Sequence, residues 1–82
     1  MTDRFTISGS RHLLDLSANL SPVERILIAD WLDQLREDPY ACGTLKVGTK
    51  STFVTQLARV EITYRVPVDY PEIVLIIDAY RY

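Results

Sequence analysis

The first half of the chain places its hydrophobic residues with a helical period. Ser21 and Glu24 have the spacing of a capping box, and Pro22 suits the first position of a helix. The residue before a proline avoids the helical region, so we predict a helix from Pro22 to just before Pro39. Its apolar side chains share one side: Leu27, Ile28, Trp31, Leu32 and Leu35. We expect Leu27, Trp31 and Leu35 to meet a sheet.

The residues before this helix carry weaker signals. The segment RFTI, from Arg4 to Ile7, alternates polar and apolar side chains, which predicts a short strand. The segment SRHLLDLSANL, residues 10–20, predicts a first helix that gives way at residues 17–19. Ser10 is placed to cap that helix at its beginning.

After the second predicted helix the hydrophobic period changes to two, which is typical of strands. The segments TLKVG, STFVTQL and VEITYRV, residues 44–48, 51–57 and 60–66, are rich in β-branched and aromatic residues. Residues 67–71 begin and end with proline and predict a connector, because proline is excluded from a central ladder. A last strand is predicted from Glu72 to about Ala79.

This order of elements predicts the fold class. Helices gathered early and strands gathered late indicate an α+β sandwich of two layers. We expect a short N-terminal strand, a helical hairpin, and then an antiparallel sheet of three or four strands. At 82 residues the chain has room for one domain, residues 1–82. One face of the sheet would meet the helices, and the other would be free as a binding surface.

Composition narrows the function classes. The net charge of −2 makes the chain a poor general binder of polyanions. Cys42 is the only cysteine and His12 the only histidine, so the sequence offers neither a disulfide nor a zinc site, and we expect no metal and no cofactor. There is no apolar run of membrane-spanning length and no signal-peptide pattern, so we expect a cytoplasmic protein without a membrane partner.

The element order and several short segments resemble the RelE/ParE superfamily of bacterial toxins. The resemblance is carried by LDQLREDP at the end of the second helix, by LKVG, and by FVTQLARVEITYRV followed by EIVLIIDAYRY. Members of that family are the toxin components of toxin–antitoxin pairs. The resemblance therefore implies an antitoxin protein as partner, and either ribosome-bound mRNA or DNA gyrase as target.

The resemblance also implies site residues for an endoribonuclease. Arg81 stands where the family carries a basic residue near its carboxyl end, and would stabilise the scissile phosphate. Lys46 stands in the family's basic segment after the helices, with Lys50 or Arg59 assisting. Tyr82 or Tyr80 would stack on a base or transfer a proton. Tyr64 and Arg65, in ITYRV, resemble the end of the family's hairpin and are predicted to bind.

Other observations favour a different interpretation. Glu61 falls where the family's hairpin carries an arginine, and the acidic pI of about 5.2 is unlike that of the ribonucleases. Tyr80 and Tyr82 should face one side of a strand and Arg81 the other. The alternative is a non-catalytic protein-interaction module with the same fold, binding through its sheet edge or its tyrosine-rich face. Whether the chain forms a homodimer is left open.

Overall fold

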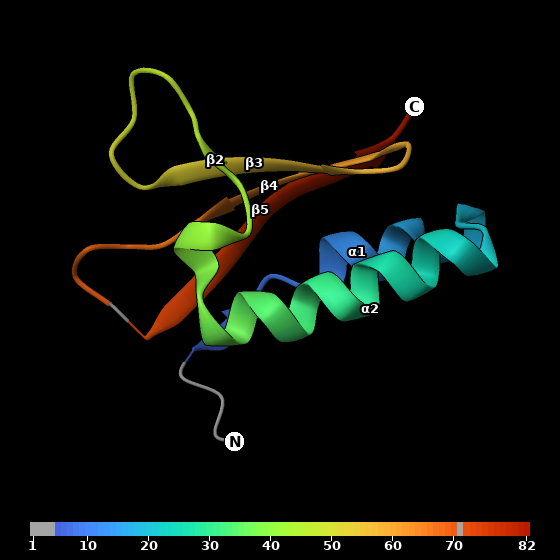
Figure 1. Cartoon of the computed structure of the whole chain (residues 1–82), viewed down its shortest axis with the longest axis horizontal. Helices are drawn as coiled ribbons and strands as arrows, with labels where there is room; N and C mark the ends of the chain where they lie inside the picture. Colours follow the sequence, from blue (N-terminus) through green and yellow to red (C-terminus); the bar gives the residue numbers. More distant parts are fainter. Residues whose placement is uncertain (1–4, 71) are drawn as a thin grey trace.

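The chain folds into one mixed sheet with both of its α-helices on the same face (Figure 1). The computed structural model describes residues 5–70 and 72–82. The strand order is β1-β5-β4-β3-β2. The strands are β1 (Thr6–Ser8), β2 (Thr44–Leu45), β3 (Thr52–Leu57), β4 (Val60–Arg65) and β5 (Ile73–Arg81). The predicted α+β class is confirmed.

The first strand changes the predicted sheet. The four later strands are antiparallel to their neighbours, but β1 joins the same sheet as a fifth strand and runs parallel to β5, with Thr6 opposite Ile73 and Ser8 opposite Leu75. The backbone N–H of Thr6 donates to the carbonyl of Glu72 at 2.8 Å. The sheet is therefore mixed. Parallel neighbours need a long connection, and here two helices and three strands lie between β1 and β5 in the chain. Arg4, in the predicted strand, lies outside the described residues.

The second helix, α2 (Pro22–Glu37), begins and ends where the sequence predicts. The Ser21 backbone N–H donates to Glu24 Oε1 at 2.9 Å, and the Glu24 N–H donates to Ser21 Oγ at 3.2 Å. Each residue of the capping box thus satisfies a backbone donor that the helix itself leaves free.

The first helix, α1 (Arg11–Leu16), is followed by a 3-10 turn, η1 (Ser17–Asn19). The prediction that Ser10 caps α1 is wrong: its side chain makes no capping bond, and its backbone is already helical. The chain enters α1 through Gly9, whose φ of 78° suits glycine. A Cβ on Gly9 would collide with the backbone carbonyl of Ile76 in β5. Gly9, and not a side-chain cap, therefore marks the beginning of α1.

The core lies between α2 and the sheet. The buried side of α2 carries Glu24, Ile28, Trp31 and Leu35. Leu27 is 38% exposed, so it is less buried than Trp31 and Leu35, with which it was predicted to meet the sheet. Leu27 lies about 40° around the helix from Trp31, at the margin of the line of four buried residues. The Trp31 ring meets Tyr64 of β4 edge-on, with centroids 5.5 Å apart.

A β-bulge divides β5. Thr63 is paired with Asp78, whereas the next residue, Tyr64, is paired with Ile76, so Ile77 is the extra residue. Side chains alternate between the two faces of a strand, and one inserted residue reverses that alternation. The bulge therefore decides which side chains at the carboxyl end face the helices.

Beyond the bulge, Arg81 takes the helix-facing side. It lies opposite Val60, which is fully buried, while Tyr80 lies opposite Glu61 on the other face. Ile76, before the bulge, is also buried. Without the inserted residue, Tyr80 would share the face of Ile76, and Arg81 would point away from the helices. We call the face without helices the open face of the sheet.

Candidate functional site

Arg81 is held by a buried carboxylate. Its Nε donates to Glu24 Oε1 at 3.0 Å and to Glu24 Oε2 at 3.1 Å. Glu24 is only 5% exposed, and the Arg81 side chain is 35% exposed. The pair joins the last residue of β5 to the first turn of α2. Part of the guanidinium predicted to hold a phosphate is thus used within the fold.

The electrostatics of Glu24 follow from its contacts. The hydrogen bond from the Ser21 backbone N–H lowers the pKa of Glu24 most, and the Arg81 guanidinium lowers it further. Burial acts in the opposite direction, because it disfavours the charged form, but it does not prevail. Glu24 is therefore ionised at neutral pH. Its carboxylate accepts the hydrogen bond of the helix cap and forms the ion pair with Arg81.

The two terminal tyrosines lie on the open face. The rings of Tyr80 and Tyr82 are 5.8 Å apart, and the Tyr80 hydroxyl donates to Glu61 Oε2 on the neighbouring strand. That hydrogen bond is the main reason why the pKa of Tyr80 is raised. The predicted division of the YRY segment, with both tyrosines on one face and Arg81 on the other, is confirmed by these contacts.

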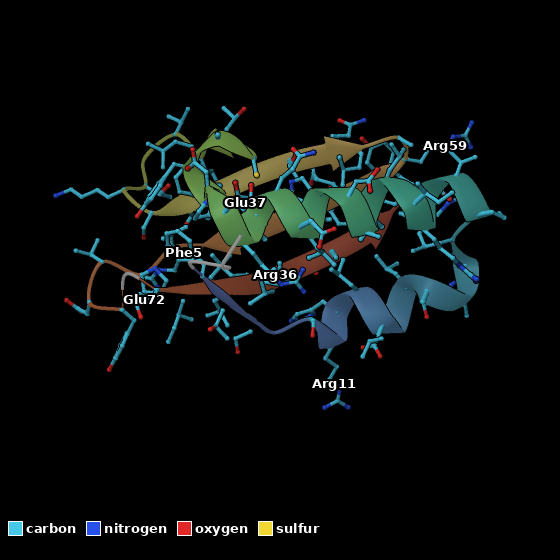
Figure 2. All side chains as sticks on the ribbon, turned by 60° about the horizontal axis from the view of Figure 1, so that its bottom comes forward. Phe5, Arg11, Arg36, Glu37, Arg59 and Glu72 are labelled. Atoms are coloured by element: carbon cyan, nitrogen blue, oxygen red, sulfur yellow. The ribbon has the colours of Figure 1, made fainter. Side chains whose placement is uncertain are left out.

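Arg59 lies at the same end of the molecule as the carboxyl terminus. It belongs to the turn between β3 and β4, where Ala58 adopts a φ of 55°. The Tyr82 backbone N–H donates to the Arg59 carbonyl at 2.9 Å. Figure 1 shows this turn beside the carboxyl end, and Figure 2 shows Arg59 and Glu72 at opposite ends of the sheet. Three of the predicted catalytic residues are thus close in space: Arg59, Arg81 and Tyr82.

The remaining predicted cations lie at the other end of β4. Arg65 Nε donates to Ser51 Oγ at 3.3 Å, and the backbone N–H of Lys46 donates to the Thr52 carbonyl at 2.8 Å. Lys50 lies in the same loop and is exposed. A strand of six residues spans roughly 17–20 Å. The structure therefore does not bring Lys46, Lys50 and Arg65 together with Arg81.

Arg65 instead lines a hollow on the open face. This hollow has a volume of about 440 Å³ and is also lined by Ser8, Ile73 and Leu75 and by residues of the β4–β5 connection. Ile73 and Leu75 are each 38% exposed, so β5 presents aliphatic side chains to solvent along this part of the open face.

Tyr64 belongs to the core and does not line a binding surface. Its side chain has no exposed area, and its hydroxyl donates to the Pro39 carbonyl at 2.7 Å. Burial raises the pKa of Tyr64 strongly, because the phenolate would be poorly solvated. In this structure the residue is out of reach of a ligand.

One edge of β5 is free of strand partners over its second half. Among the described residues, β5 pairs with β1 only from Ile73 to Leu75. The Ala79 backbone N–H donates to the carboxylate of the adjacent Asp78 at 2.9 Å, so it is turned away from β4. The Tyr82 N–H is directed toward the β3–β4 turn, so by alternation the backbone of Arg81 also faces the free edge.

The sequence did not predict a role at this site for two residues of this region, Glu24 and Asp78. Glu24 was assigned only to the helix cap, although its spacing of four from Ile28 continues the buried line of α2 and could have indicated burial. Asp78 gives no signal, because its role depends on where β1 ends and on the bulge at Ile77.

Residues 5–70 and 72–82 contain no cluster of three or more metal-binding side chains. The Cys42 thiol donates to the Asp38 carbonyl at 3.2 Å, and burial raises its pKa. Within the same ranges, neither helix has the length and apolar character needed to cross a bilayer.

The chain was also compared with known proteins. No family model, no curated protein sequence and no solved structure matches it.

Proposed function

We propose that this protein is a protein-interaction module that binds an extended segment of a partner protein. The segment adds a strand to the free edge of β5, beside residues 77–81. The observation that carries the proposal is the difference in length between β5 and its neighbour: β5 has nine residues and β1 has three. Main-chain groups of an exposed strand edge are a ready template for another strand.

The side chains around this edge suit a polypeptide ligand. Ala79 is small, and its side chain packs against the core on the helix-facing side, so it adds little bulk at the edge. Tyr80 and Tyr82 are 44% and 55% exposed on the open face, and tyrosine is favoured at protein interfaces. Backbone groups would supply affinity, and the alternating side chains would supply selectivity.

Asp78 controls access to the edge. Its carboxylate occupies the Ala79 N–H that an incoming carbonyl would need. Charged residues on edge strands are a common protection against unwanted pairing. A partner strand must therefore displace this carboxylate, which weakens self-association through the same edge.

Ala79→Pro tests the proposal. The substitution removes the N–H that faces the free edge, and proline is tolerated at strand edges where no ladder bond is lost. The probe is an eight-residue peptide of alternating threonine and valine, and its binding is measured by amide hydrogen exchange. We expect the peptide to protect the Ala79 and Arg81 amides in the parent and not to bind Ala79→Pro.

Val47→Pro is the matched control. The Thr49 N–H donates to the Lys46 carbonyl at 3.1 Å, and Gly48 has a φ of 83°, which together define a turn that accepts proline at position 47. This variant should bind the peptide like the parent. Binding without protection of residues 79 and 81, or equal binding by Ala79→Pro, would contradict strand addition at β5.

A second candidate function is that of a RelE/ParE-like toxin, acting on ribosome-bound mRNA or DNA gyrase and neutralised by an antitoxin. The closeness of Arg59, Arg81 and Tyr82 at one end of the sheet favours it. The test is bacterial growth after induced expression of the parent, of a Glu24→Gln/Arg81→Gln variant and of Arg11→Ala.

The two variants differ in what they remove. The double variant keeps a neutral hydrogen-bonding pair at the buried position, whereas Arg11 extends from α1 away from the sheet (Figure 2). Growth arrest by the parent and by Arg11→Ala, but not by the folded double variant, would support the toxin function. Unchanged growth with folded parent protein would exclude it under those conditions.

A further inference from the structure

We infer that the segment added to β5 carries an acidic side chain directly opposite Arg81. The inference rests on the proposed strand addition and specifies the chemistry of the partner. It follows from the contacts of the Arg81 guanidinium, from the side of the sheet on which Arg81 lies, and from the charges around it.

The Arg81 guanidinium keeps unused donors. Of the guanidinium nitrogens, only Nε donates to Glu24, whose two carboxylate oxygens lie 3.0 and 3.1 Å from it. Among residues 5–70 and 72–82, the two terminal nitrogens of Arg81 have no hydrogen-bond partner. An arginine presents five N–H donors, and its planar terminal pair matches a carboxylate. With the side chain 35% exposed, this pair can be reached from outside the sheet.

The strand geometry places one partner side chain beside these donors. Residues directly opposite each other on paired strands have their side chains on the same face, with Cβ atoms about 5 Å apart. Arg81 is on the helix-facing side, because it is paired with Val60 and bonded to Glu24. The partner residue opposite Arg81 therefore projects to the same side, at the margin of α2.

The charges near this position favour an acid. Glu24 and Arg81 neutralise each other, and exposed Arg59 at the adjoining turn adds a positive charge. Two other acidic side chains of this region lie on the open face, where Glu61 accepts from Tyr80 and Asp78 lies opposite Thr63. An acid next to Asp78 would be repelled, so the position opposite Arg81 is the one that suits it.

Three peptides test the inference. They share the alternating threonine–valine sequence and differ only at one central position, which is glutamate, glutamine or lysine. We expect the glutamate peptide to bind about fivefold more tightly than the glutamine peptide, and the lysine peptide to bind most weakly. Affinities are measured by calorimetric titration, with amide exchange at residues 79 and 81 reporting the place of binding.

Two further measurements tie the preference to Arg81. The Glu24→Gln/Arg81→Gln variant should bind the glutamate and glutamine peptides equally. Should that variant not fold, salt provides the second test: the advantage of glutamate in the parent should shrink as ionic strength rises, because partly exposed charges are screened. A preference that persists unchanged in the folded double variant or in high salt would overturn the inference.

The outcomes separate this inference from the proposal beneath it. If all three peptides bind equally and Ala79→Pro abolishes their binding, strand addition stands and the acidic preference is wrong. If none protects the amides of Ala79 and Arg81, both are wrong.

Discussion

Tyr64 illustrates, at the scale of single residues, how alternation along a strand outweighs local resemblance. The sequence assigns it to a binding set because ITYRV resembles a family hairpin, yet the same alternation places it with Val60 and Ile62 on the buried face. Its hydroxyl then needs an internal partner and finds the Pro39 carbonyl.

Tyr64→Phe should lower the free energy of unfolding by about 1 kcal/mol, because the Pro39 carbonyl loses its shorter hydrogen bond and keeps only the longer one from the Cys42 N–H. Urea denaturation at neutral pH measures the change. Tyr70→Phe is the control, since Tyr70 is 64% exposed; its effect should stay within about 0.5 kcal/mol. Equal effects of the two substitutions would contradict the core position of Tyr64.

Tyr80 should titrate at a higher pH than an ordinary tyrosine, because Glu61 accepts a hydrogen bond from its neutral hydroxyl. Its contribution to stability is therefore complete below the ordinary value of about 10 and is lost as the pH rises through the raised pKa. Glu61→Gln should lower the pKa of Tyr80. NMR titration of the ring measures it, with Tyr80→Phe assigning the signal; an unchanged pKa in Glu61→Gln would contradict the hydrogen bond.

At the scale of elements, the two helices begin by different means. The start of α2 is encoded locally, because a capping box and Pro22 satisfy and shape the first turn within the sequence itself. The start of α1 depends on Gly9, which lies against the backbone of Ile76 in a strand far along the chain. Local sequence therefore predicts the beginning of α2 correctly but wrongly assigns Ser10 as the cap of α1.

The serines at these two positions should respond differently to alanine. Ser21→Ala should cost about 1 kcal/mol of stability, because the Glu24 N–H loses its acceptor. Ser10→Ala should cost much less, since its side chain makes no capping bond. Thermal or urea unfolding of both variants measures the difference. A larger loss for Ser10→Ala than for Ser21→Ala would contradict the different origins of the two helix starts.

At the scale of the whole molecule, Glu24 and Arg81 connect the first turn of α2 to the last residue of β5. They are far apart in sequence, and the contact exists because the bulge at Ile77 turns Arg81 toward the helices. One pair thus links the helical layer, the sheet and the proposed binding edge. Its integrity should therefore influence both stability and peptide affinity.

Acidification should weaken this link. The pKa of Glu24 is lowered in the folded protein, so its contribution to stability is complete above the ordinary value of about 4.3 and is lost as the pH falls through the lowered pKa. Glu24→Gln should remove that part of the pH dependence. Unfolding measured between neutral and strongly acidic pH tests it; identical pH profiles for parent and variant would contradict the linkage.

The sequence by itself determined the α+β class, the bounds of α2, the strand-forming segments and the division of Tyr80 and Tyr82 from Arg81. These features depend on caps, prolines and periodicity, which act between neighbouring residues. Only the tertiary structure decided that β1 joins the sheet in parallel, that Arg81 pairs with Glu24, and that Lys46 and Arg65 lie far from Arg81. Those outcomes depend on strand order and on one inserted residue in β5, neither of which local spacing encodes.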